Sequence, residues 1–163
     1  MDKFERLNFI NQMLILEKLY PEEAEYYAKN RKALEHGYEL HYSWLVESIS
    51  DPLSEDQCKQ VLDILDMYRS ITFSWERLHD GEEIPSKLKF RGFDGNNETA
   101  QMGYTQYFIN DLDRFRELTY DSDYCDFNSH CPMLGKYSRM LTVWKSLDSF
   151  ELSEEEIEAV VAA

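Results

Sequence analysis

The sequence predicts an all-α protein. Three observations carry this prediction: apolar residues recur at three- and four-residue spacing, helix start and stop signals frame those stretches, and strand-like alternation is almost absent. We expect a multi-helical single domain over residues 1–163, with about six to seven helices around a long central helix at residues 54–78. At most a minor extended segment is expected near residues 87–91.

The central helix has a strong start signal. Ser54 is placed to cap it, Gln57 stands at the third helical position to return the hydrogen bond, and Leu53 precedes the cap as an apolar staple. At 1.5 Å per residue this helix is roughly 37 Å long, which reaches across a domain of this size. Its apolar stripe consists of Cys58, Val61, Leu62, Leu65, Tyr68, Thr72, Trp75 and Leu78.

The residues before the central helix predict three helices. Apolar spacing over residues 3–19 indicates the first, which Pro21 ends. Pro21 also suits the first turn of a second helix that Gly37 terminates. The third, shorter helix is predicted by four apolar residues at helical spacing, Tyr42, Leu45, Val46 and Ile49.

Residues 79–97 interrupt the helical pattern with three glycines and a proline. Only residues 87–91 alternate polar with apolar side chains, as either a short strand or an extended loop. Asn96 or Asn97 is then expected to cap a helix. The buried stripe predicted for that helix is Ala100, Tyr104, Tyr107, Phe108, Leu112 and Phe115.

Two more helices are predicted near the end of the sequence. After an irregular stretch over residues 119–131, Pro132 is expected to start a helix. Ser153 and Glu156 form a capping-box pattern for a short final helix. The first of these helices is expected to bury Leu134, Tyr137, Leu141 and Trp144.

Composition and charge exclude some function classes. Seventeen basic and 32 acidic residues give a formal charge of −15, which repels phosphate backbones and anionic membrane surfaces. We therefore expect no direct nucleic-acid binding and no membrane association. The odd set of three cysteines, with no secretory signal or membrane-length apolar run, indicates a cytoplasmic protein with reduced thiols. Eleven tyrosines favour self-association, although a tyrosine-rich rim of the core explains them equally well.

No motif in the sequence assigns catalytic residues, a metal or a cofactor, and we expect none of the three. Glu76 and His79 have the E-x-x-H spacing of di-iron bundles, but a second such pair is absent from the sequence. Cys125, His130 and Cys131 do not have the paired short spacing of a zinc site, and their role stays open.

The most unusual local chemistry lies in residues 87–94. Three cations at alternate positions in an acidic chain, beside aromatic rings and a turn, suggest a site for a small anion or a nucleotide-like ligand. The structural alternative is that the cations neutralise acidic helices while the phenylalanines cover the core. The candidate ligand-binding residues are Lys87, Lys89, Phe90, Arg91, Gly92, Phe93 and Asp94.

Several segments, in order along nearly the whole chain, resemble the YfbU family of uncharacterised bacterial proteins. They include LEKLYPEEAEYY, LDILDMYRSITFSW, KFRGFD, GYTQYFIN, FNSHCPMLGKYSRMLTVW and LSEEEIEAVV. The resemblance implies a mainly helical, cytoplasmic domain that forms a homo-oligomer. It implies no established activity and no catalytic residues.

Two functional hypotheses follow. The first is a self-associating regulatory or protein-interaction module without catalytic activity. The second is an enzyme or a sensor of small anionic ligands centred on residues 87–94. Binding of an anionic compound that depends on Arg91 favours the second.

Overall fold

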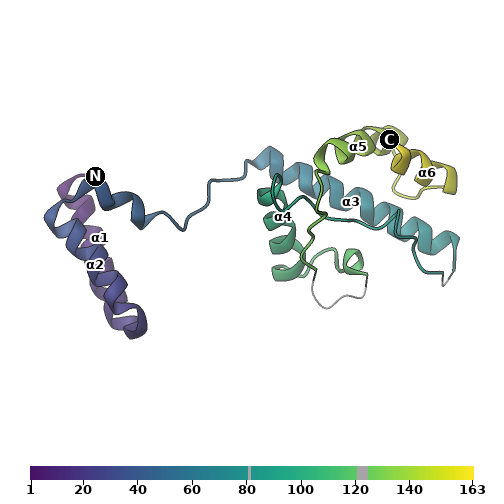
Figure 1. The fold of residues 1–163 in the computed structure, drawn as a ribbon. Coiled ribbons are helices and arrows are strands. Elements are labelled where there is room, and N and C mark those ends of the chain that lie inside the picture. Colours follow the sequence, from purple (N-terminus) through teal and green to yellow (C-terminus); the bar gives the residue numbers. More distant parts are fainter. Residues whose placement is uncertain (81, 121–124) are drawn as a thin grey trace. The chain divides into compact units, whose positions relative to one another are not determined.

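The computed structural model describes residues 1–80, 82–120 and 125–163 and confirms the all-α class. The chain forms two compact units, Met1–Pro52 and Leu53–Ala163 (Figure 1). The single domain expected over residues 1–163 stays a prediction. Within the described residues, no helix combines the length and apolar character that crossing a bilayer requires.

The first unit is a helical hairpin followed by a 3₁₀ segment. α1 (Lys3–Leu19) starts with a capping box between Asp2 and Glu5, and α2 (Ala24–His36) follows a 3₁₀ turn, η1 (Pro21–Glu23). Gly37 ends α2 in the left-handed conformation, at φ 73°. The two helices pack against each other.

The third helix predicted in this unit is wrong in type. Residues Glu39–Leu45 form a 3₁₀ helix, η2, rather than an α-helix. Short α-helices depend on packing one apolar face, because nucleation is costly. Here Trp44, Val46 and Ile49 are exposed, so that packing is missing.

The second unit is organised around α3 (Glu55–Leu78), which confirms the predicted central helix. Ser54 caps α3 and Gln57 returns the hydrogen bond. α4 (Thr99–Gln106), α5 (Leu134–Leu147) and α6 (Glu154–Ala162) all pack against α3, and α5 also packs against α6 (Figure 1).

The buried face of α3 is wider than the predicted stripe. Leu78, predicted to be buried, is exposed, whereas Ile64, Met67 and Ile71 are fully buried although the stripe omitted them. A helix contacted by elements on several sides buries more than one narrow stripe. The aliphatic part of the core around α3 includes Val61, Ile64, Leu65, Leu88, Ile109, Leu118, Leu152, Ile157 and Val160.

The predicted start and buried face of α4 need correction. Neither Asn96 nor Asn97 caps the helix, which begins after Glu98. Tyr107 and Leu112 are exposed, and Ala100 is exposed as well. A π-helical turn, η3 (Tyr107–Asp111), follows α4, and its wider turn rotates later residues away from the expected face. Thr105 and Ile109 are buried instead.

Among the described residues, neither the connection from α3 to α4 nor that from α4 to α5 contains a strand. A 3₁₀ turn, η4 (Arg116–Thr119), contacts α3, and a single isolated bridge pairs Phe93 with Asn128. Residues 87–91 are therefore not a strand, although Leu88 and Phe90 are buried and Lys87 and Arg91 are exposed, as their alternation predicts. α5 begins at Leu134, two residues after Pro132.

The capping box at Ser153 and Glu156 starts α6 as predicted.

Candidate functional site

The two lysines of the candidate site contact carboxylates and an aromatic ring. The Nζ of Lys87 lies 3.9 Å from a carboxylate oxygen of Glu158 on α6. Lys89 forms a 2.9 Å ion pair with Glu83, and its ammonium lies 5.3 Å from the centre of the Tyr120 ring. Exposed ion pairs contribute about 0–1 kcal/mol each. The lysines therefore neutralise acidic neighbours, as the structural alternative expects.

Phe90 is a central contact of the core. Its ring centre lies 5.3 Å from that of Tyr68 and 5.9 Å from each of Phe93, Phe127 and Tyr137. Tilted and edge-on aromatic pairs at these distances add roughly 0.5–1.5 kcal/mol beyond the area that they bury. Phe90 and Phe93 thus belong to the packed interior.

Gly92 lies where two chain segments cross. Its φ is +82°, and a Cβ added there would stand 1.9 Å from the backbone oxygen of Phe127. The next residue, Phe93, forms two backbone hydrogen bonds to the other segment. Its N–H donates to the Phe127 carbonyl at 2.9 Å, and its carbonyl accepts from the Ser129 N–H at 3.0 Å. The Tyr137 hydroxyl also donates to the Gly92 carbonyl at 2.9 Å. Glycine is needed here for close backbone approach and for its dihedral angle.

Asp94 directs its carboxylate back onto its own turn. The carboxylate accepts from the Asn97 side-chain amide and from the Asn96 backbone N–H, the latter at 3.1 Å. The Asn97 amide, followed by the Asn96 N–H, lowers the pKa of Asp94. These partners indicate that Asp94 shapes the loop.

Glu98 is a buried carboxylate that the sequence did not single out. It accepts from the Asp94 N–H at 2.9 Å and from the Met133 and Leu134 N–H groups at 2.8 Å each. Those last two donors lie at the start of α5, where free N–H groups and the helix dipole favour a negative charge. Glu98 therefore ties the 92–98 loop to the beginning of α5.

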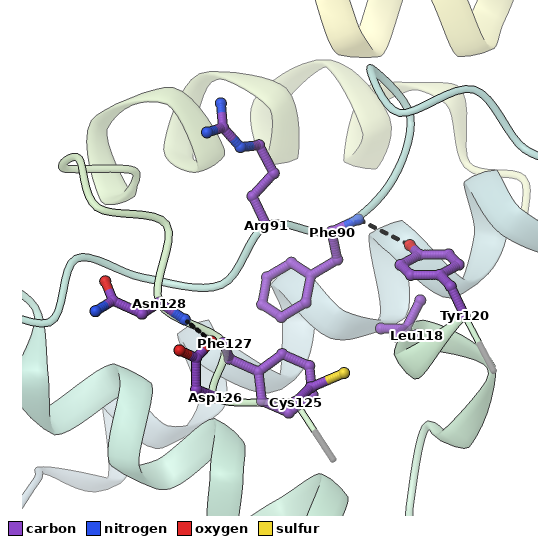
Figure 2. Close-up of a pocket in the computed structure, with 8 residues that line it drawn as sticks. All are labelled: Phe90, Arg91, Leu118, Tyr120, Cys125, Asp126, Phe127 and Asn128. Atoms are coloured by element: carbon purple, nitrogen blue, oxygen red, sulfur yellow. Dashed lines mark hydrogen bonds between the residues drawn. The ribbon is translucent and has the colours of Figure 1, made fainter. Parts of the chain in front are cut away.

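A cavity of about 520 Å³ opens beside this loop (Figure 2). The Phe90 N–H donates to the Tyr120 hydroxyl at 2.8 Å on one side, and the Cys125 thiol donates to the Thr119 carbonyl at 3.6 Å. Burial raises the pKa of Tyr120 above its ordinary value. The lining residues are Phe90, Arg91, Leu118, Tyr120, Cys125, Asp126, Phe127 and Asn128.

The charges of this cavity are unevenly placed. Figure 2 shows the Arg91 side chain directed away from Cys125 and Asp126. The Asp126 carboxylate accepts from the Asn128 N–H at 3.1 Å and adds a negative charge to the lining. Of the seven candidate ligand residues, the structure brings Phe90 and Arg91 to this cavity, while Lys87 and Lys89 pair with carboxylates elsewhere.

The family model for the YfbU domain matches residues 1–163, the whole chain. This chain belongs to the YfbU family.

A second cavity in this YfbU chain is acidic. It holds about 310 Å³ next to the end of α3, and its charged lining is Glu76, Glu82, Glu83, Lys89, Arg116 and Glu117. Arg69 pairs with Glu117 from the side of α3. The surplus of carboxylates opposes anion binding there. Among the described residues, no three His, Cys, Asp or Glu side chains gather as a metal site would require.

The E-x-x-H pair of the YfbU chain is divided between two contacts. His79 stacks on Trp75 with ring centres 3.6 Å apart, and its Nε2 lies 3.7 Å from Glu154 of α6. Glu76 instead lines the acidic cavity. His79 therefore links the end of α3 to α6.

The cysteines contact their own loops. The Cys131 thiol lies 3.8 Å from the Met133 sulfur, and the neighbouring His130 is exposed. Asp121 and Asp123, which the sequence places near Cys125, lie outside the described residues.

The first unit of the YfbU chain has a cavity of its own, of about 450 Å³. The side-chain amide nitrogen of Asn30 is buried there without a hydrogen-bond partner in the described part of the chain. Helical periodicity predicts burial from the spacing of apolar residues. It therefore did not indicate Asn30, a polar residue between charged neighbours on α2.

Proposed function

We propose that this YfbU chain is a self-associating regulatory or protein-interaction module of the cytoplasm, without catalytic activity. The observation that supports the proposal is the distribution of exposed apolar side chains. Of the 19 large exposed apolar residues among the described residues, 14 lie within residues 1–52, a third of the chain. Contiguous apolar surface beyond a few hundred Å² is rare on monomers and marks interaction sites.

The first unit also has little interior of its own. Leu34 is the one apolar side chain in residues 1–52 that is buried, and no residue of α1 is buried. Units of this size are marginally stable even with a full core. A second copy that covers the exposed apolar residues supplies the missing burial.

Light scattering after size exclusion, over a range of protein concentrations, tests the proposal. We expect a mass above that of one chain. Because the chain carries a formal charge of −15, we expect salt to strengthen the association by screening self-repulsion. A strictly monomeric mass at all concentrations and salt levels contradicts the proposal.

The cytoplasmic assignment is supported by the thiols. Cys58, Cys125 and Cys131 are all free. An oxidising compartment favours disulfides, so three unpaired cysteines fit a reducing one.

A second candidate function is a sensor of small anions or nucleotide-like ligands. The supporting observation is the 520 Å³ cavity, whose volume is in the range of small-molecule sites, with Arg91 in its lining. A thermal-shift screen with phosphate, AMP and small dicarboxylates tests it. A ligand at a hundred times its dissociation constant adds about 2.7 kcal/mol of stability. A shift that persists in Arg91→Ala contradicts this site.

A further inference from the structure

The first unit contains a cavity that its own residues form, between α2 and the residues that follow this helix. The cavity measures about 450 Å³, a volume within the range of small-molecule sites. Half of its lining comes from one side of α2, at three- and four-residue spacing, and the other half from η2 and the turn after it. The lining residues are Tyr26, Lys29, Asn30, Trp44, Glu47 and Ser48.

Asn30 brings an unused hydrogen-bond donor to this cavity. Its side chain is only 6% exposed, and its amide nitrogen has no hydrogen-bond partner among residues 1–52. Buried polar groups in folded proteins are nearly always paired, so an unpaired one requires a specific explanation. The terminal torsion of asparagine is soft, and a ligand in the cavity can draw the amide toward an acceptor of its own. A bound molecule with a carbonyl oxygen or a ring nitrogen completes the hydrogen bonding of Asn30.

Two aromatic rings of the lining indicate the shape of that molecule. The Trp44 ring packs on His41, with ring centres 4.3 Å apart, and the Tyr26 ring packs edge-on against Tyr27 at 5.4 Å. Each ring is thereby held by a neighbour within the same unit. Aromatic side chains bind flat heterocycles by stacking, and this stacking accepts any nucleobase because every base has a π-face. A planar ring with an acceptor at its edge fits both the aromatic rings and the Asn30 amide.

The charges of the lining disfavour a phosphate group. The Lys29 ammonium lies 2.8 Å from the Glu25 carboxylate, so its charge is already paired. Glu47 adds a negative charge to the lining, and the whole chain carries a formal charge of −15. Glu47 and Ser48 can accept hydrogen bonds from the amino group of a base or from the hydroxyls of ribose. The cavity therefore suits an uncharged ligand.

We propose that this cavity binds a neutral nucleobase or nucleoside, which stacks on Trp44 and accepts a hydrogen bond from the Asn30 amide. Asparagine is one of the side chains whose geometry matches the edge of a base. The site shares no lining residue with the cavity beside Arg91. The inference does not depend on self-association of the chain, so failure of either one leaves the other standing.

Isothermal titration of the full chain with adenosine, guanosine, cytidine and uridine tests the site. We expect saturable binding of one or more of the four, and we expect Asn30→Leu to weaken that binding at least tenfold. Asn8→Leu makes the same chemical change at an exposed position of α1 outside the lining, and it should leave the dissociation constant unchanged. No binding of any of the four nucleosides, or equal affinity in wild type and Asn30→Leu, overturns the proposal.

The melting temperature of Asn30→Leu without ligand separates a binding role from a structural one. Leucine has nearly the shape of asparagine and removes a buried polar group that lacks a partner, so we expect the melting temperature to equal or exceed that of wild type. The nucleoside should then raise the melting temperature of wild type but not that of the variant. A variant that melts below wild type shows that the amide has a partner within the folded chain, which also overturns the proposal.

Trp44→Ala tests the stacking contact. We expect the dissociation constant of the nucleoside to rise at least fivefold, because the base loses its aromatic platform. Tyr38→Ala removes an exposed ring of the same unit that does not line the cavity, and it should not change the dissociation constant. Equal dissociation constants for Trp44→Ala and wild type contradict the proposed arrangement.

Discussion

The Glu98 carboxylate accepts a 2.8 Å hydrogen bond from the backbone N–H of Met133, 35 residues later in the chain. Through this contact the loop before α4 satisfies the free donors at the start of α5. No local pattern links the two segments, so the contact exists only in the folded chain.

Glu98→Ala should therefore destabilise the second unit by about 3 kcal/mol, because it leaves buried N–H groups of Met133 and Leu134 without an acceptor. Urea denaturation followed by circular dichroism measures the change. Glu158→Ala, which removes only the exposed partner of Lys87, is the control and should change stability by less than about 0.5 kcal/mol. Equal effects of the two substitutions contradict the role assigned to Glu98.

Gly92→Ala should cost at least about 2 kcal/mol, since it adds left-handed strain and forces the new Cβ against the Phe127 carbonyl. Gly103→Ala is a matched control, because nothing lies within 4 Å of a Cβ added there. Gly103 lies inside α4, so alanine should stabilise that helix by up to about 1 kcal/mol. Thermal melts of both variants decide the sign of each change, and a stable Gly92→Ala variant refutes the steric argument.

Asp94→Asn should reduce the sensitivity of folding to acid. The Asn97 and Asn96 hydrogen bonds hold the pKa of folded Asp94 below its ordinary value of 3.8, so the unfolded chain binds the proton more readily. The stabilisation by this carboxylate is therefore complete above pH 3.8 and is lost as pH falls through the lower, folded value. Asparagine does not titrate, so unfolding of the Asp94→Asn variant takes up no proton at this position.

The measurement is the urea midpoint of wild type and Asp94→Asn at pH values from neutral down to about 2. We expect the difference between the two proteins to be largest at neutral pH and to shrink in acid. A constant difference across the series indicates that Asp94 does not contribute through its charge.

Ser54→Ala should lower the stability of the second unit by about 1 kcal/mol, because the Gln57 N–H loses its acceptor at the start of α3. Ser54→Asp keeps an acceptor and adds a charge that the helix start favours, so it should be neutral or slightly stabilising. Urea midpoints of the two variants test this cap. A loss in Ser54→Asp equal to that in Ser54→Ala argues against capping as the cause.

The candidate ligand site shows which of its features could be predicted from residue types alone. The alternation of residues 87–91 correctly predicts that Lys87 and Arg91 are exposed and that Leu88 and Phe90 are buried. Alternating residues can point to the core and to solvent in turn even where the segment is not a strand. It does not reveal that Lys87 and Lys89 face Glu158 and Glu83. The cavity lining joins Phe90 and Arg91 to Leu118, Tyr120 and residues 125–128, which are distant from this loop in the sequence.

The sequence by itself determined the helical class, the position of α3, and the capping boxes at Ser54 and Ser153, because caps and periodicity involve residues within one or two helical turns. It also determined membership of the YfbU family. Only the tertiary structure decided that Ile64 and Met67 are buried, that Glu98 reaches α5, and that α2 does not bury any residue of α1. Those features depend on which segments meet in space, and such long-range contacts leave no trace in local spacing.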